Sequence, residues 1–113
     1  MINVKGDKTP VELTANIKNY AEALPPGLHM MWSATSADIE VTGQPVANMG
    51  FIYEVVKQSS SVIQIKAIPF SGNNTVYLLR KHGSTWRPWV AFSGNLLGRG
   101  VTNVCNFPLR EVA

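Results

Sequence analysis

The chain has 113 residues, about the size of one domain, and 45% of them are hydrophobic, which excludes a disordered chain. Only 15% are charged, against roughly 25% in typical soluble domains, so we expect a partner subunit or neighbouring domain to cover part of the surface. The formal net charge is +3, and Lys and Arg are spread along the chain rather than concentrated, so we expect no nucleic-acid binding.

The N-terminal part of the chain predicts a linker followed by a helix. Residues 1–9 are polar and aperiodic, which is typical of a linker or arm. Thr9, Pro10 and Glu12 have the spacing of a capping box with proline at the first helical position. The helical spacing continues in the apolar side chains of Leu13, Ile17, Tyr20, Ala21 and Leu24. A Pro-Pro-Gly sequence then ends the pattern, so we expect a helix over about residues 10–24.

After Gly27 the hydrophobic period changes to two, which indicates strands. We expect strands over residues 28–33, 50–57, 61–68, 75–82 and 85–92, with a short edge strand over residues 37–41. The polar alternation is typical of an antiparallel sheet with one wet face. The sequence therefore predicts an α+β domain over residues 10–92, in which the N-terminal helix packs on a small antiparallel meander of about four to six strands. Residues 93–113 are expected to form a C-terminal tail or connector.

The sequence holds no recognisable catalytic or metal-binding constellation. His29 and His82 lie in no nucleophile motif, and Asp38 and Glu40 are a weak basis for a hydrolytic carboxylate pair. Cys105 is the only cysteine, so it forms no internal disulfide, and no ligand partner lies near it in the sequence. We therefore expect no enzyme activity, no catalytic residue, no metal and no cofactor.

The sequence also shows no membrane or export signal. No stretch reaches the roughly 18 apolar residues of a membrane helix. The first eight residues do not have the apolar region of a signal peptide. We expect synthesis in the cytoplasm and no membrane insertion.

The segment from Asn73 to Phe92 is the most distinctive part of the chain. It combines a strand that carries an aromatic residue and an arginine, a Gly-Ser-Thr turn, and a Trp-x-x-Trp motif formed by Trp86 and Trp89. Upstream lie a Pro-Gly turn into the first strand and the sequence Gly-Phe-Ile-Tyr-Glu-Val. In these features residues 10–92 resemble the knob module of contractile pyocin and bacteriophage tail fibres.

The resemblance implies a module of a phage tail fibre or tailspike, located in the virion tail and made in the host cytoplasm. Such a module would be part of an elongated homotrimer, would adjoin neighbouring fibre domains, and would attach without catalysis to a bacterial surface polysaccharide. The alternative is a structural trimerisation or assembly module with no receptor contact. An enzyme, either a depolymerase or an autoprotease, is the least favoured hypothesis.

The last predicted hairpin supplies the candidate ligand-binding residues. Exposed Trp or Tyr can stack on sugar C–H faces, whereas Arg and His bond hydroxyl or anionic groups. The candidates are Tyr77, Arg80, His82, Trp86 and Arg87. Trp86 and Trp89 are three apart, so on a regular strand they point to opposite faces, one toward the core and one partly exposed. The alternative is that the aromatic residues belong to the core and the polar residues are merely solvated.

Overall fold

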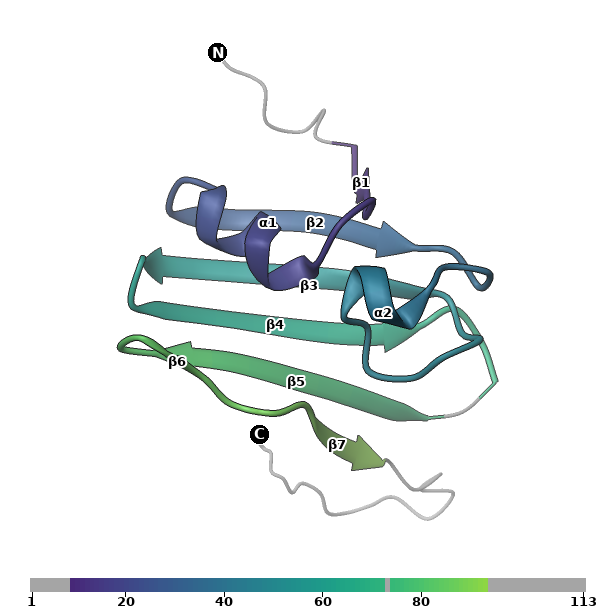
Figure 1. The fold of residues 1–113 in the computed structure, drawn as a ribbon. Helices are drawn as coiled ribbons and strands as arrows, with labels where there is room; N and C mark the ends of the chain where they lie inside the picture. The colour runs from purple at the N-terminus through teal and green to yellow at the C-terminus, as the bar shows by residue number, and fades with distance from the viewer. Residues whose placement is uncertain (1–8, 73, 94–113) are drawn as a thin grey trace.

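The computed structural model describes residues 9–72 and 74–93, which form a twisted sheet with two short helices (Figure 1). The strands lie in chain order from β1 to β6. Strand β7 also pairs with β5, at the N-terminal part of that strand, whereas β6 pairs with its C-terminal end. Their bounds are β1 Val11–Glu12, β2 Gly27–Ser33, β3 Phe51–Ser59, β4 Val62–Pro69, β5 Thr75–His82, β6 Thr85–Trp86 and β7 Val90–Ser93. The helices are α1 Ile17–Ala23 and α2 Ile39–Thr42. Of the predicted linker (residues 1–9) and tail (residues 93–113), residues 1–8 and 94–113 lie outside the described residues, and Cys105 lies among them.

The predicted α+β fold, a helix on a small antiparallel meander, is wrong. The described part of the chain is mostly sheet, with seven strands, and β1 runs parallel to β2, so the sheet is mixed. The helices are short, with seven residues in α1 and four in α2. The four long strands β2 to β5 do pair antiparallel and in sequence, and their bounds lie within two residues of the predicted ones.

The first helix begins later than predicted because sheet pairing takes the residues before it. Val11 pairs with Met31 in β2, and the Leu13 amide donates to the Trp32 carbonyl at 2.8 Å. The backbone groups of the expected capping box therefore form hydrogen bonds in the sheet instead of starting a helix. The long-range pairing overrides the local helix propensity of these residues. The helix starts instead after Asn16, whose side chain accepts a hydrogen bond from the Lys18 amide at 2.9 Å.

Two further expected strands also differ from the structure. The edge strand expected over residues 37–41 is replaced by α2, because Asp38 caps a helical turn and Gly43 ends it with a φ of 71°. The strand expected over residues 85–92 is divided into β6 and β7. Pro88 lies between them and has no amide hydrogen to donate to a sheet partner, so the ladder is interrupted there.

The core lies between the helices and one face of the sheet, and both helices cover that same face (Figure 1). Buried apolar side chains come from α1, from the segment before it, and from every second residue of the strands, as period two requires. They are Leu13, Ile17, Ala21, Met31, Phe51, Tyr53, Val55, Ile63, Ile65, Ala67 and Leu79. Trp86 and Trp89 both pack against this cluster, so they do not point to opposite faces. The irregular backbone at Pro88, between β6 and β7, explains how two residues three apart reach the same side.

One buried polar pair crosses the core. The hydroxyls of Ser33 and Tyr53 lie 2.7 Å apart, and both residues are fully buried. Desolvation raises the pKa of the Tyr53 phenol to about 12, although the hydrogen bond with Ser33 acts in the opposite direction. The neutral pair therefore fixes the register of β2 on β3 in a part of the core that water does not reach.

Removing one hydroxyl of this pair should cost more than removing both. We expect Tyr53→Phe and Ser33→Ala each to lower the free energy of unfolding by about 1–3 kcal/mol, because each leaves the other hydroxyl buried without a partner. The double variant should lose less than the sum of the two. Denaturant unfolding of the four proteins measures this coupling, and simple additivity would contradict the buried pair.

Candidate functional site

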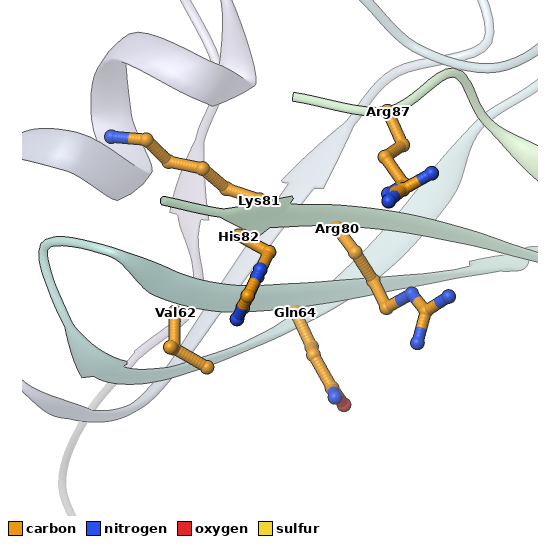
Figure 2. A pocket seen from close by; sticks show the side chains of 6 residues that line it. All are labelled: Val62, Gln64, Arg80, Lys81, His82 and Arg87. Atoms are coloured by element: carbon orange, nitrogen blue, oxygen red, sulfur yellow. The ribbon is translucent and has the colours of Figure 1, made fainter. Parts of the chain in front are cut away.

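A shallow pocket lies at one end of β4 and β5 (Figure 2). Its volume is about 210 Å³, below the roughly 300–1,000 Å³ of pockets for drug-sized ligands. The pocket is lined by Val62, Gln64, Arg80, Lys81, His82 and Arg87. A site of this size can hold one charged group or one sugar ring.

Sheet register brings these side chains together. Gln64 pairs directly with Arg80, and Val62 pairs with His82, so the four residues share one face. Arg87 joins them because its amide donates to the Arg80 carbonyl at 2.9 Å. In Figure 2 the Arg80, His82 and Gln64 side chains extend to one side of the strands, whereas the Lys81 side chain extends toward a helix.

The pocket is positively charged and has no acidic residue in its lining. Within residues 9–72 and 74–93, the ion pairs are Lys66 with Glu54 and Lys81 with Glu22. Neither arginine therefore has a carboxylate partner in the described part of the chain, and both are exposed. A planar guanidinium can give two parallel hydrogen bonds to a carboxylate or phosphate, so the arrangement suits an anionic group.

The structure brings together three of the five predicted ligand-binding residues, Arg80, His82 and Arg87. Tyr77 instead lies on the helix-covered face, where its ring meets the edge of Phe51 at a centroid distance of 5.7 Å. Trp86 lies on that face too, because its strand partner is Lys81. The five residues therefore do not form one site.

Three lining residues were not predicted from the sequence: Lys81, and Val62 and Gln64 on the neighbouring strand. The alternation in residues 61–68 places Gln64 on the wet face, which is a signal that it is exposed. Its position beside Arg80 depends on the register of β4 on β5, however, and that register is set by pairing across the turn.

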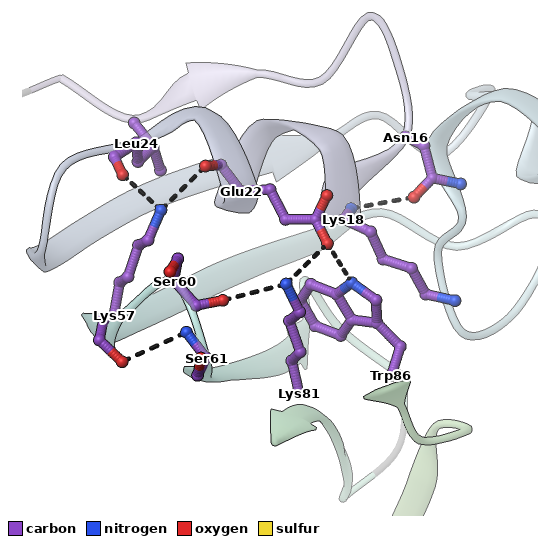
Figure 3. A network of polar contacts seen from close by, with 10 residues as sticks. Asn16, Lys18, Glu22, Leu24, Lys57, Ser60, Ser61, Lys81 and Trp86 are labelled. Carbon is purple, nitrogen blue, oxygen red and sulfur yellow. Dashed lines mark hydrogen bonds and ion pairs between the residues drawn. The ribbon is translucent and has the colours of Figure 1, made fainter. Parts of the chain in front are cut away.

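A polar network fastens the last hairpin to α1 (Figure 3). One carboxylate oxygen of Glu22 accepts from Trp86 Nε1 at 2.7 Å and lies 3.3 Å from Lys81 Nζ. The Lys81 ammonium also donates to the Ser60 carbonyl at 3.0 Å. Lys18 Nζ lies 5.9 Å from the centroid of the Trp86 ring, which adds a cation–π contact. Trp86 is thus a structural anchor, and its indole N–H is already bonded.

Glu22 is expected to make this anchor sensitive to acid. The hydrogen bond from Trp86, followed by that from Lys81, lowers the pKa of the Glu22 carboxyl from its ordinary value of 4.5. Because the folded-state pKa is the lower one, the charged carboxylate stabilises the fold fully above pH 4.5, and this contribution is lost as pH falls through the lowered value. The Glu22 side chain is 42% exposed, so solvent screens the effect.

Glu22→Gln should therefore lower the free energy of unfolding at neutral pH by up to about 1 kcal/mol. The difference from the unsubstituted protein should shrink as pH falls from 4.5 through the lowered pKa, at which the carboxyl of the folded protein loses its charge. Denaturant unfolding at a series of pH values measures this difference, with Glu54→Gln as the control for loss of a surface carboxylate. A difference in the free energy of unfolding that grows in acid would contradict a stabilising role for the Glu22 carboxylate.

The same network contains a buried lysine that caps α1. Lys57 Nζ donates to the carbonyls of Glu22 at 2.9 Å and Leu24 at 2.6 Å, and the residue is only 6% exposed. These carbonyls belong to the last turn of the helix, where no intrahelical donor is available. The lysine therefore joins β3 to the end of α1.

Lys57→Gln should lower the free energy of unfolding by about 1–3 kcal/mol, because the shorter neutral side chain leaves helix carbonyls unsatisfied. The matched control is Lys66→Gln, which removes an exposed lysine from the next strand and should cost less than about 1 kcal/mol. Equal losses for the two variants in chemical denaturation would show that Lys57 does not cap the helix.

No protein-family model, curated protein or solved structure matches this chain. Among the described residues, no group of three or more His, Cys, Asp or Glu side chains could hold a metal ion. In the same part of the chain, no helix has the length and apolar character needed to cross a membrane.

Proposed function

We propose that this chain is a non-catalytic module of a phage tail fibre or tailspike that attaches to an acidic polysaccharide on the surface of the host bacterium. It would act in the virion tail, as a homotrimer beside neighbouring fibre domains, without a cofactor. The Trp-x-x-Trp hairpin supports the fibre assignment through its resemblance to knob modules. The pocket supports the acidic character of the ligand.

The observation that carries the ligand class is the pair of exposed arginines around a small pocket. Arg80 and Arg87 have no carboxylate partner in the described residues, and Gln64 can donate or accept beside them. A uronic carboxylate or a phosphate substituent on a polysaccharide matches this donor set. Because such groups repeat along the polymer, copies of a weak site on one fibre would bind with avidity.

A neutral glycan fits the pocket less well. Sugar recognition without charge relies on an exposed aromatic face, and no aromatic residue lines the pocket. Tyr77 packs on Phe51, and Trp86 is bonded to Glu22, so both rings already have structural contacts. Charge therefore distinguishes the proposed ligand from other surface polymers.

The direct test uses the full chain displayed on beads and a panel of acidic and neutral bacterial polysaccharides. Arg80→Gln and Arg87→Gln should each weaken binding to acidic polymers by about 10- to 100-fold, because each removes a charge-assisted hydrogen bond of about 1.5–3 kcal/mol. Binding should also weaken as salt concentration rises.

The matched control for this experiment is Lys66→Gln, which removes one positive charge outside the pocket and should leave binding nearly unchanged. Equal binding to neutral and acidic polymers would contradict the proposed ligand class. So would an equal loss in all three variants, because this would indicate general attraction to a cationic surface rather than a site.

A second candidate function is assembly of the fibre without receptor contact. The observation that favours it is the apolar character of the sheet face that the helices leave uncovered. Leu28, Val56 and Phe92 on that face are 60%, 50% and 55% exposed. Contact between copies through this face would not require the pocket to bind a glycan.

A further inference from the structure

The sheet face opposite α1 and α2, hereafter the open face, carries many large apolar side chains. It is formed by the side chains that alternate with the core residues along β2, β3, β4, β5 and β7. In the described part of the chain, no helix covers it (Figure 1). Its apolar members are Leu28, Met30, Trp32, Ile52, Val56, Val62, Ile68, Val76, Leu78, Val90 and Phe92.

These side chains form two apolar groups on the open face, one on β2, β3 and β4 and the other on β5 and β7. Ile52 in β3 pairs with Trp32 on one side and Ile68 on the other. At the opposite edge, Val76 pairs with Phe92 and Leu78 pairs with Val90. Directly paired residues lie on the same face, so apolar side chains occur on it in each of these strands. Polar or charged residues interrupt them in the β4–β5 pairs Val62 with His82, Gln64 with Arg80, and Lys66 with Leu78. Monomeric proteins rarely leave a patch of this extent in water.

The central charge pair on the open face is self-complementary. Glu54 and Lys66 are strand partners near its centre, with Lys66 Nζ 3.5 Å from Glu54 Oε1. A twofold axis that runs along the strands between β3 and β4 would place Glu54 of each copy opposite Lys66 of the other. The central charges would then form a compact group of alternating sign, which stabilises contact between like faces.

The size of the face also fits a second copy. Five strands about 4.8 Å apart, with about seven residues at roughly 3.3 Å each, give a footprint of about 550 Å². Side chains make the accessible area larger than the footprint, so it approaches the roughly 800 Å² that each partner buries in a standard interface. Two sheets packed face to face in this way form an ordinary sandwich interface about 10 Å thick.

We propose that the open face is the contact surface between copies of this chain in solution. The occupant is a second copy, whether it meets the first about a twofold axis or three copies face a common axis. Gln64 and Arg80 also lie on this face, where the twofold contact would set them opposite Val56 and Leu28 of the other copy. A second copy and a glycan would therefore compete for part of the pocket. The proposal goes beyond the glycan site and does not depend on it.

Sedimentation of the full chain without any glycan tests the proposal. We expect a dimer or trimer at micromolar concentration. Ile52→Glu and Val56→Glu should raise the dissociation constant at least about tenfold, because each would bury an unpaired charge in the interface. Val41→Glu is the matched control: Val41 is 45% exposed but lies on α2, so association should be unchanged. Circular dichroism establishes that each variant is folded.

A charge exchange tests the orientation of the two faces. Glu54→Lys should weaken association, and the double variant Glu54→Lys with Lys66→Glu should restore it, because the alternating pattern returns. A full chain that stays monomeric up to high micromolar concentration overturns the proposal, whatever else covers the face. So does association that is equally strong in Val56→Glu and Val41→Glu. Either result leaves the glycan test intact, since that test measures binding to a polymer.

Discussion

Both helices in residues 9–72 and 74–93 lie on the same face of the sheet, and the remaining features follow from that constraint. A pleated sheet places alternate residues on opposite faces, so only every second side chain of β2 to β5 can reach the core. Tyr53 and Ile65 are fully buried for this reason, whereas the next residue in each strand, Glu54 or Lys66, is exposed or half-buried. The side chains on the open face are therefore available for contact with another molecule.

The last hairpin shows how the same constraint separates structural from binding residues. Trp86 and Lys81 face α1, where Glu22 bonds to both (Figure 3). The residues that alternate with them, Arg80 and Arg87, must then point away from the helix. Lys81 both contacts Glu22 and lines the pocket, whereas Arg80 and Arg87 take no part in the anchor, so substitutions at the two arginines need not disturb it.

The long strands could be predicted from the sequence because their signals are local. Period-two alternation and turn residues mark β2 to β5 without knowledge of their partners. The start of α1 could not be predicted, since the pairing of Val11 with Met31 joins residues that are distant in the sequence. Helix α2 was mistaken for a strand because four residues are too few to show a helical period.

The candidate site was predictable in part. Arg80 and His82 are two residues apart on a strand, so their shared face follows from the sequence. Tyr77 and Trp86 were included for their chemistry, but the strand alternation and the β5–β6 register place them on the other face. The partnership of Gln64 with Arg80 required the register between β4 and β5. Side-chain chemistry alone was therefore insufficient to define the site.

The central claim is that an acidic glycan binds on the open side of the last hairpin, away from its tryptophan. NMR titration of the isotopically labelled full chain with an acidic oligosaccharide, and with a neutral one of equal length, tests it most directly. We expect only the acidic sugar to shift the side-chain signals of Arg80 and Arg87, while the Trp86 indole N–H signal stays in place. Equal shifts with the neutral sugar, or a response centred on Trp86, would contradict it.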